Sequence, residues 1–172
     1  MNIMMKTLLS AAALTAFTGV AHAGNQECDT GTGTSKCHDT IPIELVVAKK
    51  CVLRADDKIT VDSKTGVGTG SFWVGANANY NLLVNTTYHG QTGATGTDES
   101  YLKGSGSNTT TIPTTVTTKR GTKSINLGVA ALGEPMALTT MNQYSVTVKT
   151  KNAIGSVLAD KYSDLYSIDV YF

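Results

Sequence analysis

After residue 23 the chain alternates apolar and polar side chains in short segments, and no long window carries a helical period. Apolar residues at every second position predict β-strands that bury one face. Turns rich in glycine, asparagine and proline separate the segments. The predicted strands lie at 41–54, 58–62, 71–74, 78–88, 109–118, 124–129, 144–148 and 164–172. About seven short strands of this kind predict an all-β fold, a sandwich of two sheets.

The first 23 residues have the pattern of a signal peptide. Lys6 supplies the positive charge, residues 8–20 are largely apolar, and Ala21-His22-Ala23 is a small-x-small cleavage site. The apolar run is too short to span a membrane. We therefore expect export and cleavage before Gly24, which leaves a chain of the size of one domain.

The charge of the chain gives no reason to expect a nucleic-acid partner. The formal net charge is +1, and Lys6 leaves with the signal peptide. No basic cluster after residue 23 is larger than Lys49-Lys50 or Lys119-Arg120. A neutral chain is not drawn to nucleic acid or to an anionic membrane.

Three cysteines, Cys28, Cys37 and Cys51, lie early in the exported chain. Export favours oxidation of one pair and leaves one thiol over. A pairing of Cys28 with Cys37 closes a turn-forming loop and is favoured, with Cys51 then a buried thiol. A pairing of Cys37 with Cys51 would need the strand between them to fold back. No CxxC motif occurs, so neither a redox motif nor a zinc knuckle is predicted.

The residues that carry enzyme chemistry are sparse. His38 and His89 are far apart and have no carboxylate or cysteine at a metal-ligand spacing. A Ser-His-Asp enzyme would need His89 as its base, at the start of a predicted loop over 89–107. No nucleophile elbow or phosphate-binding loop is present. We expect no enzyme activity, no cofactor and no metal site.

Two segments have an ordinary structural interpretation beside a binding one. Phe72 and Trp73 could stack on a sugar, but a core tryptophan is the expectation for a sandwich. The threonine-rich stretch 109–118 could be an adhesive face, but is expected to be a solvent-exposed outer strand.

The two ends of the exported chain carry its most distinctive patterns. A polar leader, residues 24–38, precedes an alternating segment that has Pro42 near its start and so an edge-like end. Its apolar face comprises Ile41, Ile43, Leu45 and Val47. A second alternating segment continues to the last residue and comprises Tyr166, Ile168, Val170 and Phe172, with Tyr171 penultimate.

These two ends together resemble the subunits of chaperone–usher pili. Tyr171 matches that family's penultimate tyrosine, whereas Ala159 stands where the family usually has glycine. Residues 43–57 are similar to the start of Dr-type and aggregative-adherence fimbrial subunits. In those subunits the cysteine pairs with a later one, and this chain has none after Cys51.

The resemblance implies an incomplete immunoglobulin-like β-sandwich that is completed by donor-strand exchange. It implies a signal peptide at 1–23, an N-terminal extension at 24–47 and a pilin domain at 48–172. Ile41, Ile43, Leu45 and Val47 would form the donor strand, and Tyr166, Ile168, Val170, Tyr171 and Phe172 the strand beside the groove. The implied partners are identical subunits, a periplasmic chaperone, an outer-membrane usher and a host receptor. The protein would pass through the periplasm to a surface fimbria that serves adhesion or biofilm formation.

Two other functions remain open on sequence grounds. In the first, the protein is a monomeric secreted binding module, lectin-like or receptor-binding, whose closed sandwich uses 41–53 as its first strand. In the second, which has less support, it is a secreted hydrolase.

Overall fold

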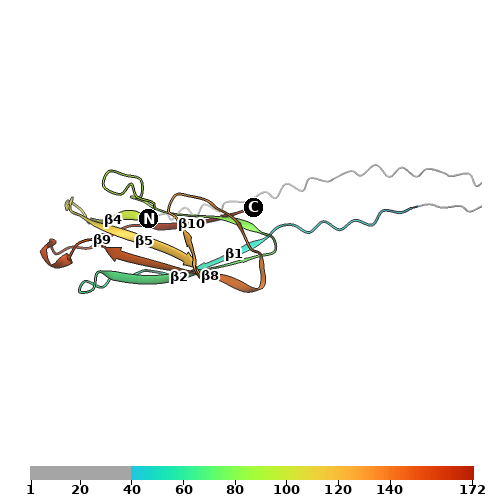
Figure 1. Cartoon of the computed structure of the whole chain (residues 1–172), viewed down its shortest axis with the longest axis horizontal. Helices are drawn as coiled ribbons and strands as arrows, with labels where there is room; N and C mark the ends of the chain where they lie inside the picture. Colours follow the sequence, from blue (N-terminus) through green and yellow to red (C-terminus); the bar gives the residue numbers. More distant parts are fainter. Residues whose placement is uncertain (1–39) are drawn as a thin grey trace, which may run out of the picture. The chain divides into compact units, whose positions relative to one another are not determined.

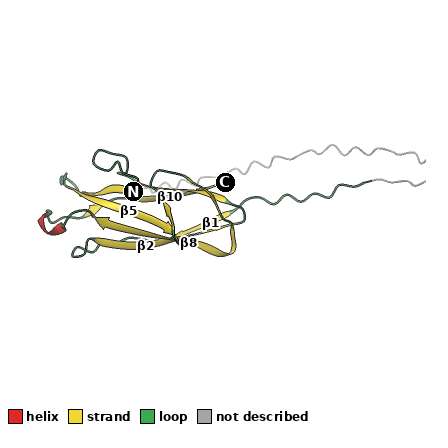
Figure 2. Ribbon diagram, in the orientation of Figure 1, coloured by secondary structure: helices red, strands yellow, loops and turns green. Residues whose placement is uncertain are grey.

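The computed structural model describes residues 40–172. One compact unit begins at Val46 and runs to the C-terminus, and residues 40–45 belong to a separate unit. The unit from Val46 is nearly all β, and its one helical turn is the 3₁₀ turn η1 (Ile154–Ser156) (Figure 2). Every strand pairing in the described chain is antiparallel.

The larger sheet has the order β1-β2-β8-β5-β4-β9, with β6 added beside β5 (Figure 1). Its strands are β1 (Cys51–Ala55), β2 (Val67–Ala76), β4 (Glu99–Gly104), β5 (Thr111–Arg120), β6 (Lys123–Ile125), β8 (Ala137–Thr150) and β9 (Tyr162–Ser163). The centre of this sheet carries a strict inward alternation, because β2 and β5 bury every second residue.

The smaller sheet has the order β10-β3-β7. Its strands are β3 (Tyr80–Thr86), β7 (Ala131–Glu134) and β10 (Tyr166–Tyr171). The two sheets share one apolar core, in which Phe72 of β2 stacks on Tyr144 of β8 with ring centroids 4.6 Å apart. From the smaller sheet, Leu82 and Val84 of β3 are fully buried in the same core.

A buried acid joins the two sheets on the β7 side. Glu134 of β7 has no exposed surface, and its carboxylate accepts hydrogen bonds from Arg120, Lys123 and the Tyr144 hydroxyl. The Tyr144 hydroxyl also lies 2.8 Å from that of Tyr80. Burial raises the pKa of Glu134, but these hydrogen bonds outweigh it and hold the pKa below its ordinary value. This side of the core is therefore closed by a satisfied polar network.

The prediction of a solvent-exposed strand at 109–118 is wrong. β5 lies inside the larger sheet, with β8 on one side and β4 and β6 on the other. Ile112, Thr114, Val116 and Thr118 are all buried. A threonine presents a methyl group as well as a hydroxyl, so a run of threonines also suits a central strand.

Several other predictions are corrected by the structure. Residues 58–62 form no strand, and the predicted loop 89–107 contains β4. Phe72 rather than Trp73 is the core aromatic of β2, because Trp73 lies on the outward phase of the alternation. Cys51 is exposed rather than buried, since all of β1 lies on the outer edge of the sheet.

Candidate functional site

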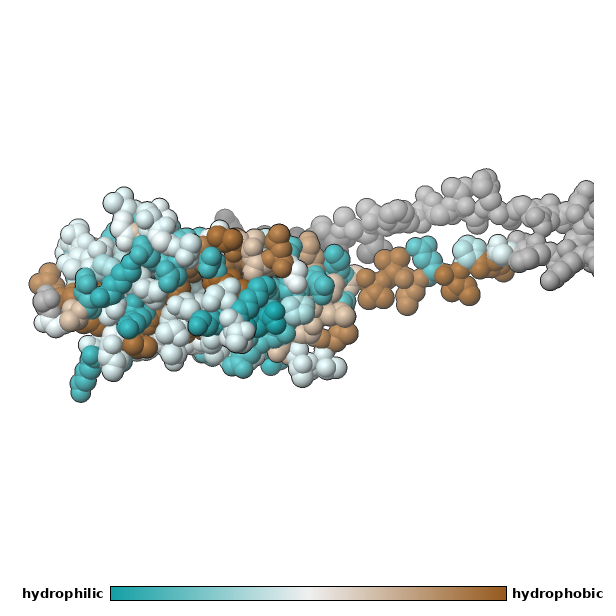
Figure 3. Space-filling view, in the orientation of Figure 1, coloured by the Kyte–Doolittle hydropathy of each residue, from teal (hydrophilic) through white to brown (hydrophobic). Residues whose placement is uncertain are grey.

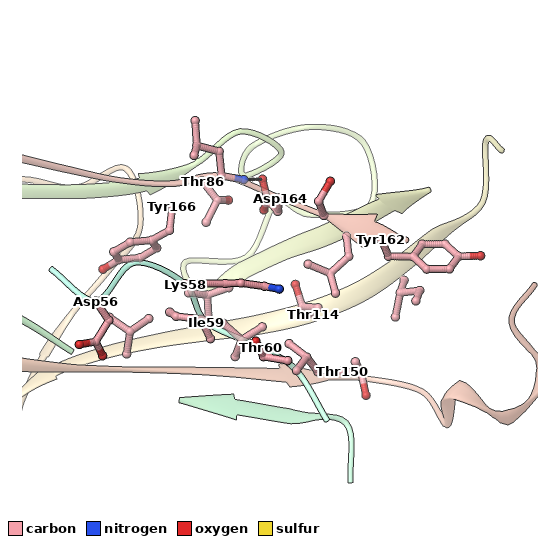
Figure 4. Close-up of a pocket in the computed structure, with 18 of the residues that line it drawn as sticks. Asp56, Lys58, Ile59, Thr60, Thr86, Thr114, Thr150, Tyr162, Asp164 and Tyr166 are labelled. Atoms are coloured by element: carbon pink, nitrogen blue, oxygen red, sulfur yellow. Dashed lines mark hydrogen bonds between the residues drawn. The ribbon is translucent and has the colours of Figure 1, made fainter. Parts of the chain in front are cut away.

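A groove of about 590 Å³ opens between the two sheets on the β10 side. Its floor is the inner face of the larger sheet, and its walls are β10 with the residues before it and the segment between β1 and β2 (Figure 4). Apolar lining residues include Ile59, Phe72, Val116, Val148 and Ile168. The groove is thus a part of the core that the described chain leaves uncovered.

β10 forms one wall and is an edge strand. It pairs only with β3, in an unbroken register from Tyr166 opposite Thr86 to Tyr171 opposite Asn81. No other described strand pairs with its second edge. The inward residues of β10 are only half-buried, whereas all four inward residues of its neighbour β3 are fully buried. The core is therefore complete at β3 and incomplete at β10.

Residues 57–61 form the opposite wall and also lack strand partners. Within the described chain, none of these five residues makes a backbone hydrogen bond. Ile59 and Val61 nevertheless pack against the core. This segment lies close to two glycines of β2 that leave room for it. A Cβ built on Gly70 would lie 2.6 Å from Ile59, and one built on Gly68 would lie 2.7 Å from the Thr60 carbonyl oxygen. Two unpaired stretches of backbone therefore face the same groove.

Side-chain hydrogen bonds fix β10 in place. Just before the strand, Asp164 accepts hydrogen bonds from the Thr87 amide (3.1 Å) and the Ser100 hydroxyl (2.5 Å). Within the strand, the Tyr166 hydroxyl lies 2.7 Å from the Thr118 hydroxyl of the larger sheet. Burial raises the pKa of Tyr166 to about 12, so this phenol stays neutral. These hydrogen bonds therefore hold β10 in a defined position although its second edge is unpaired.

One polar atom in the groove has no partner. Thr114 is buried on the floor, and its hydroxyl is the one buried side-chain oxygen or nitrogen of the described residues without a hydrogen bond. Lys58, Thr60 and Thr150 project into the same space (Figure 4). An occupant of the groove therefore meets apolar residues along most of the floor and one orphan hydroxyl.

The predicted donor residues lie within the described part of the chain and form no strand. Ile41, Ile43, Leu45 and Val47 are all exposed large apolar side chains. Residues 40–50 carry no strand, and only β1, at Cys51–Ala55, realises part of the predicted 41–54 strand. The described part of this tail is largely apolar in the space-filling view (Figure 3). The binding-module alternative needs 41–53 as its first strand, and the structure places a strand only at the end of that range.

The predicted groove residues divide into two groups. Tyr166 and Ile168 line the groove, and Val170 packs against the core beside them. Tyr171 and Phe172 are exposed, and Phe172 lies under the Lys49 ammonium at 5.5 Å. The candidate disulfide of Cys28 and Cys37 lies outside the described residues. Sequence reasoning missed residues 57–61 as the second wall, although the alternating Ile59 and Val61 were a usable signal.

Among the described residues, Ser100, His89 and Asp164 do not form a hydrolase triad. The Ser100 hydroxyl donates directly to Asp164 and is buried. His89 donates from Nδ1 to the Glu99 carbonyl oxygen (3.0 Å) and makes no hydrogen bond to Ser100. A base must reach the proton that it abstracts, and neither ring nitrogen of His89 is hydrogen-bonded to a serine of the described residues. Within residues 40–172, no three histidine, cysteine or acidic side chains are grouped to hold a metal ion.

No protein-family model and no curated protein sequence matches this chain. Over the described residues, no helix has the length and apolar character needed to cross a membrane. The groove and the tail that precedes β1 are the features of the described chain that bear on function.

Proposed function

We propose that this protein is a structural subunit of a surface fimbria that polymerises by donor-strand exchange and mediates adhesion or biofilm formation. In this proposal the domain is an incomplete immunoglobulin-like sandwich. The tail of one subunit supplies the strand that completes the core of the next. Each subunit both donates and accepts, so the contact is head-to-tail and does not close, which produces a fibre.

The observation that carries the proposal is the match between the groove and the tail. The groove has an apolar floor and two walls of unpaired backbone, β10 and residues 57–61. An extended segment can satisfy both walls with backbone hydrogen bonds while alternate side chains enter the space between the sheets. The tail supplies such a segment, with apolar residues at every second position from Ile41 to Val47.

The energetics favour a long-lived junction. Each large aliphatic side chain contributes about 1.5–3 kcal/mol when it moves from water into the core. The four tail residues Ile41, Ile43, Leu45 and Val47 are all exposed in the isolated chain, so each has that gain available. An exposed edge such as β10 would otherwise invite uncontrolled pairing. A periplasmic chaperone and an outer-membrane usher are the proposed partners that occupy and then release it.

A deletion tests this proposal. We expect a chain lacking residues 24–47 to accept a tail but to donate none, so that it terminates fibres of the full-length chain. The removed residues Val46 and Val47 are exposed, so the deletion leaves the core intact. Sedimentation of mixtures at rising mole fractions of the deleted chain should show progressively shorter polymers. Assembly of the deleted chain with itself would contradict the assignment of the donor.

A further inference from the structure

Three hydrogen bonds attach the chain just before β1 to Asn77. Its side-chain oxygen accepts from the Lys50 amide (2.6 Å), and its side-chain nitrogen donates to the Ala48 carbonyl (2.9 Å). Its backbone amide donates to the Lys50 carbonyl (3.1 Å). Residues from Ala48 onward are therefore held on the domain. The length of tail that another molecule can take up ends at Val47.

This attachment leaves no linker between two joined subunits. If Val47 lies in a neighbour's groove, the next residue, Ala48, is already bonded to its own domain. Consecutive Cα atoms are about 3.8 Å apart. The surface around Asn77 must then touch the neighbouring subunit at the place where the tail leaves its groove.

The direction of the added strand decides which end of the groove that is. All pairings in the described chain are antiparallel, and an added strand of the same kind runs opposite to β10. β10 starts next to Leu165 and ends next to Phe172, and Phe172 lies beside Lys49 and so near Asn77. An antiparallel tail therefore leaves the groove beside Leu165.

Both surfaces that would meet carry exposed apolar side chains. Next to Asn77, Met136 donates its amide to Asn79 (3.1 Å), and Leu138 follows the pairing of Ala76 with Ala137. Met136 and Leu138 are 56% and 70% exposed. At the other end, Leu165 lines the groove and is 71% exposed. Leu158, whose carbonyl accepts a hydrogen bond from the Tyr162 hydroxyl of β9 (2.9 Å), is 66% exposed.

We propose that Met136 and Leu138 of one subunit pack on Leu158 and Leu165 of the next. This inference rests on the proposed function, and its partner is a second copy of this chain. The short attachment at Ala48 makes the contact obligatory, and the exposed apolar side chains at both surfaces make it favourable. Each junction then has two parts, the inserted tail and a direct contact between domains that removes a hinge from the fibre.

Paired cysteines test the contact in the assembled polymer. The parent is the full chain with Cys28, Cys37 and Cys51 all replaced by serine, because Cys51 lies beside Leu138 in a surface depression and the other two cysteines would also compete for oxidation. The double variant Leu138→Cys with Leu165→Cys should give, on mild oxidation, a ladder of disulfide-linked subunits. Neither single variant nor the parent should give this ladder. Polymer without that ladder overturns the contact alone. Linked dimers from the single variant Leu138→Cys would show that the inserted tail runs parallel to β10, which would also overturn the proposed contact. A parent that forms no polymer contradicts the proposed function as well.

An insertion provides a second measurement that does not depend on cysteines. Two Gly-Ser pairs between Val47 and Ala48 leave the tail and the groove unchanged but separate the two domains. We expect the inserted chain to polymerise, with a persistence length in electron micrographs several-fold below that of the native fibre. An unchanged persistence length would show that the domains do not brace each other.

Discussion

Two adjacent valines in the tail offer a matched test of how it enters the groove. Val46 and Val47 are both exposed in the isolated chain, at 81% and 69%, and both precede the residues held by Asn77. Substitution of either by alanine removes the same two carbons and leaves the domain core untouched. They differ only in phase, because Val47 shares the alternation of Ile41, Ile43 and Leu45.

The expected difference follows from the carbons that enter the core. Burial of a methylene contributes about 0.8 kcal/mol, so Val47→Ala should weaken binding by about 1.6 kcal/mol, or about 15-fold. Val46→Ala should change binding by less than about twofold, since that side chain points away from the groove. Ile43→Ala removes three carbons and should cost about 2.4 kcal/mol, or about 50-fold.

Calorimetric titration of synthetic peptides measures these differences directly. Peptides covering residues 39–50, native or substituted, are titrated into the chain lacking residues 24–47, whose groove is free of competing tails. Equal losses for Val46→Ala and Val47→Ala would refute a strand of defined phase. A larger loss for Val46→Ala would place the opposite face of the tail, with Pro42 and Glu44, in the groove and would refute the donor assignment.

Three further predictions concern the subunit itself. Thr114→Val should raise the free energy of unfolding by about 1 kcal/mol, because it replaces a hydroxyl without a hydrogen-bond partner by a methyl group of equal size. A decrease in this free energy, measured by urea unfolding, would show that the hydroxyl has a partner. Arg120→Met should lower it by about 3 kcal/mol, and Glu134→Gln by about 1 kcal/mol, since only the first leaves a fully buried carboxylate short of a partner. Because the pKa of Glu134 is lowered in the folded state, its carboxylate stabilises the fold above a pH of about 4.3. This stabilisation is lost as the pH falls through the folded pKa, so Glu134→Gln should flatten the acid side of the plot of stability against pH.

Periodicity predicted the strand content well where one face of a strand is buried. β3, β8 and β10 follow alternations that are plain in the sequence, and their inward residues Leu82, Val146 and Ile168 contact the core. The order of strands could not be read in the same way. Whether β5 is central or peripheral depends on which strands flank it, and an alternation of threonine with other β-branched residues suits both places.

The candidate site was predicted in part. The sequence identified β10 and the tail, because both carry long apolar alternations, one near residue 41 and the other at 166–172. It did not identify residues 57–61 as a wall, since their position depends on the glycines Gly68 and Gly70 that let them approach β2. It also gave no sign of the attachment at Asn77, which depends on the geometry of one side-chain amide. Such features arise from tertiary contacts and leave little trace in local patterns.

The four strands at the ends of the two sheet orders, β1, β9, β10 and β7, differ in how their free edges are protected. β9 has two residues, and β7 has four with a register shift, so neither presents a long regular ladder. β1 carries Arg54, a charge of the kind that discourages pairing. β10 has six residues in unbroken register, carries no lysine, arginine or proline, and has one charged residue, Asp169. Natural sheets protect edges that must stay single. The longest regular edge among these four strands lies along the groove, which is the arrangement that the proposed donor-strand exchange requires.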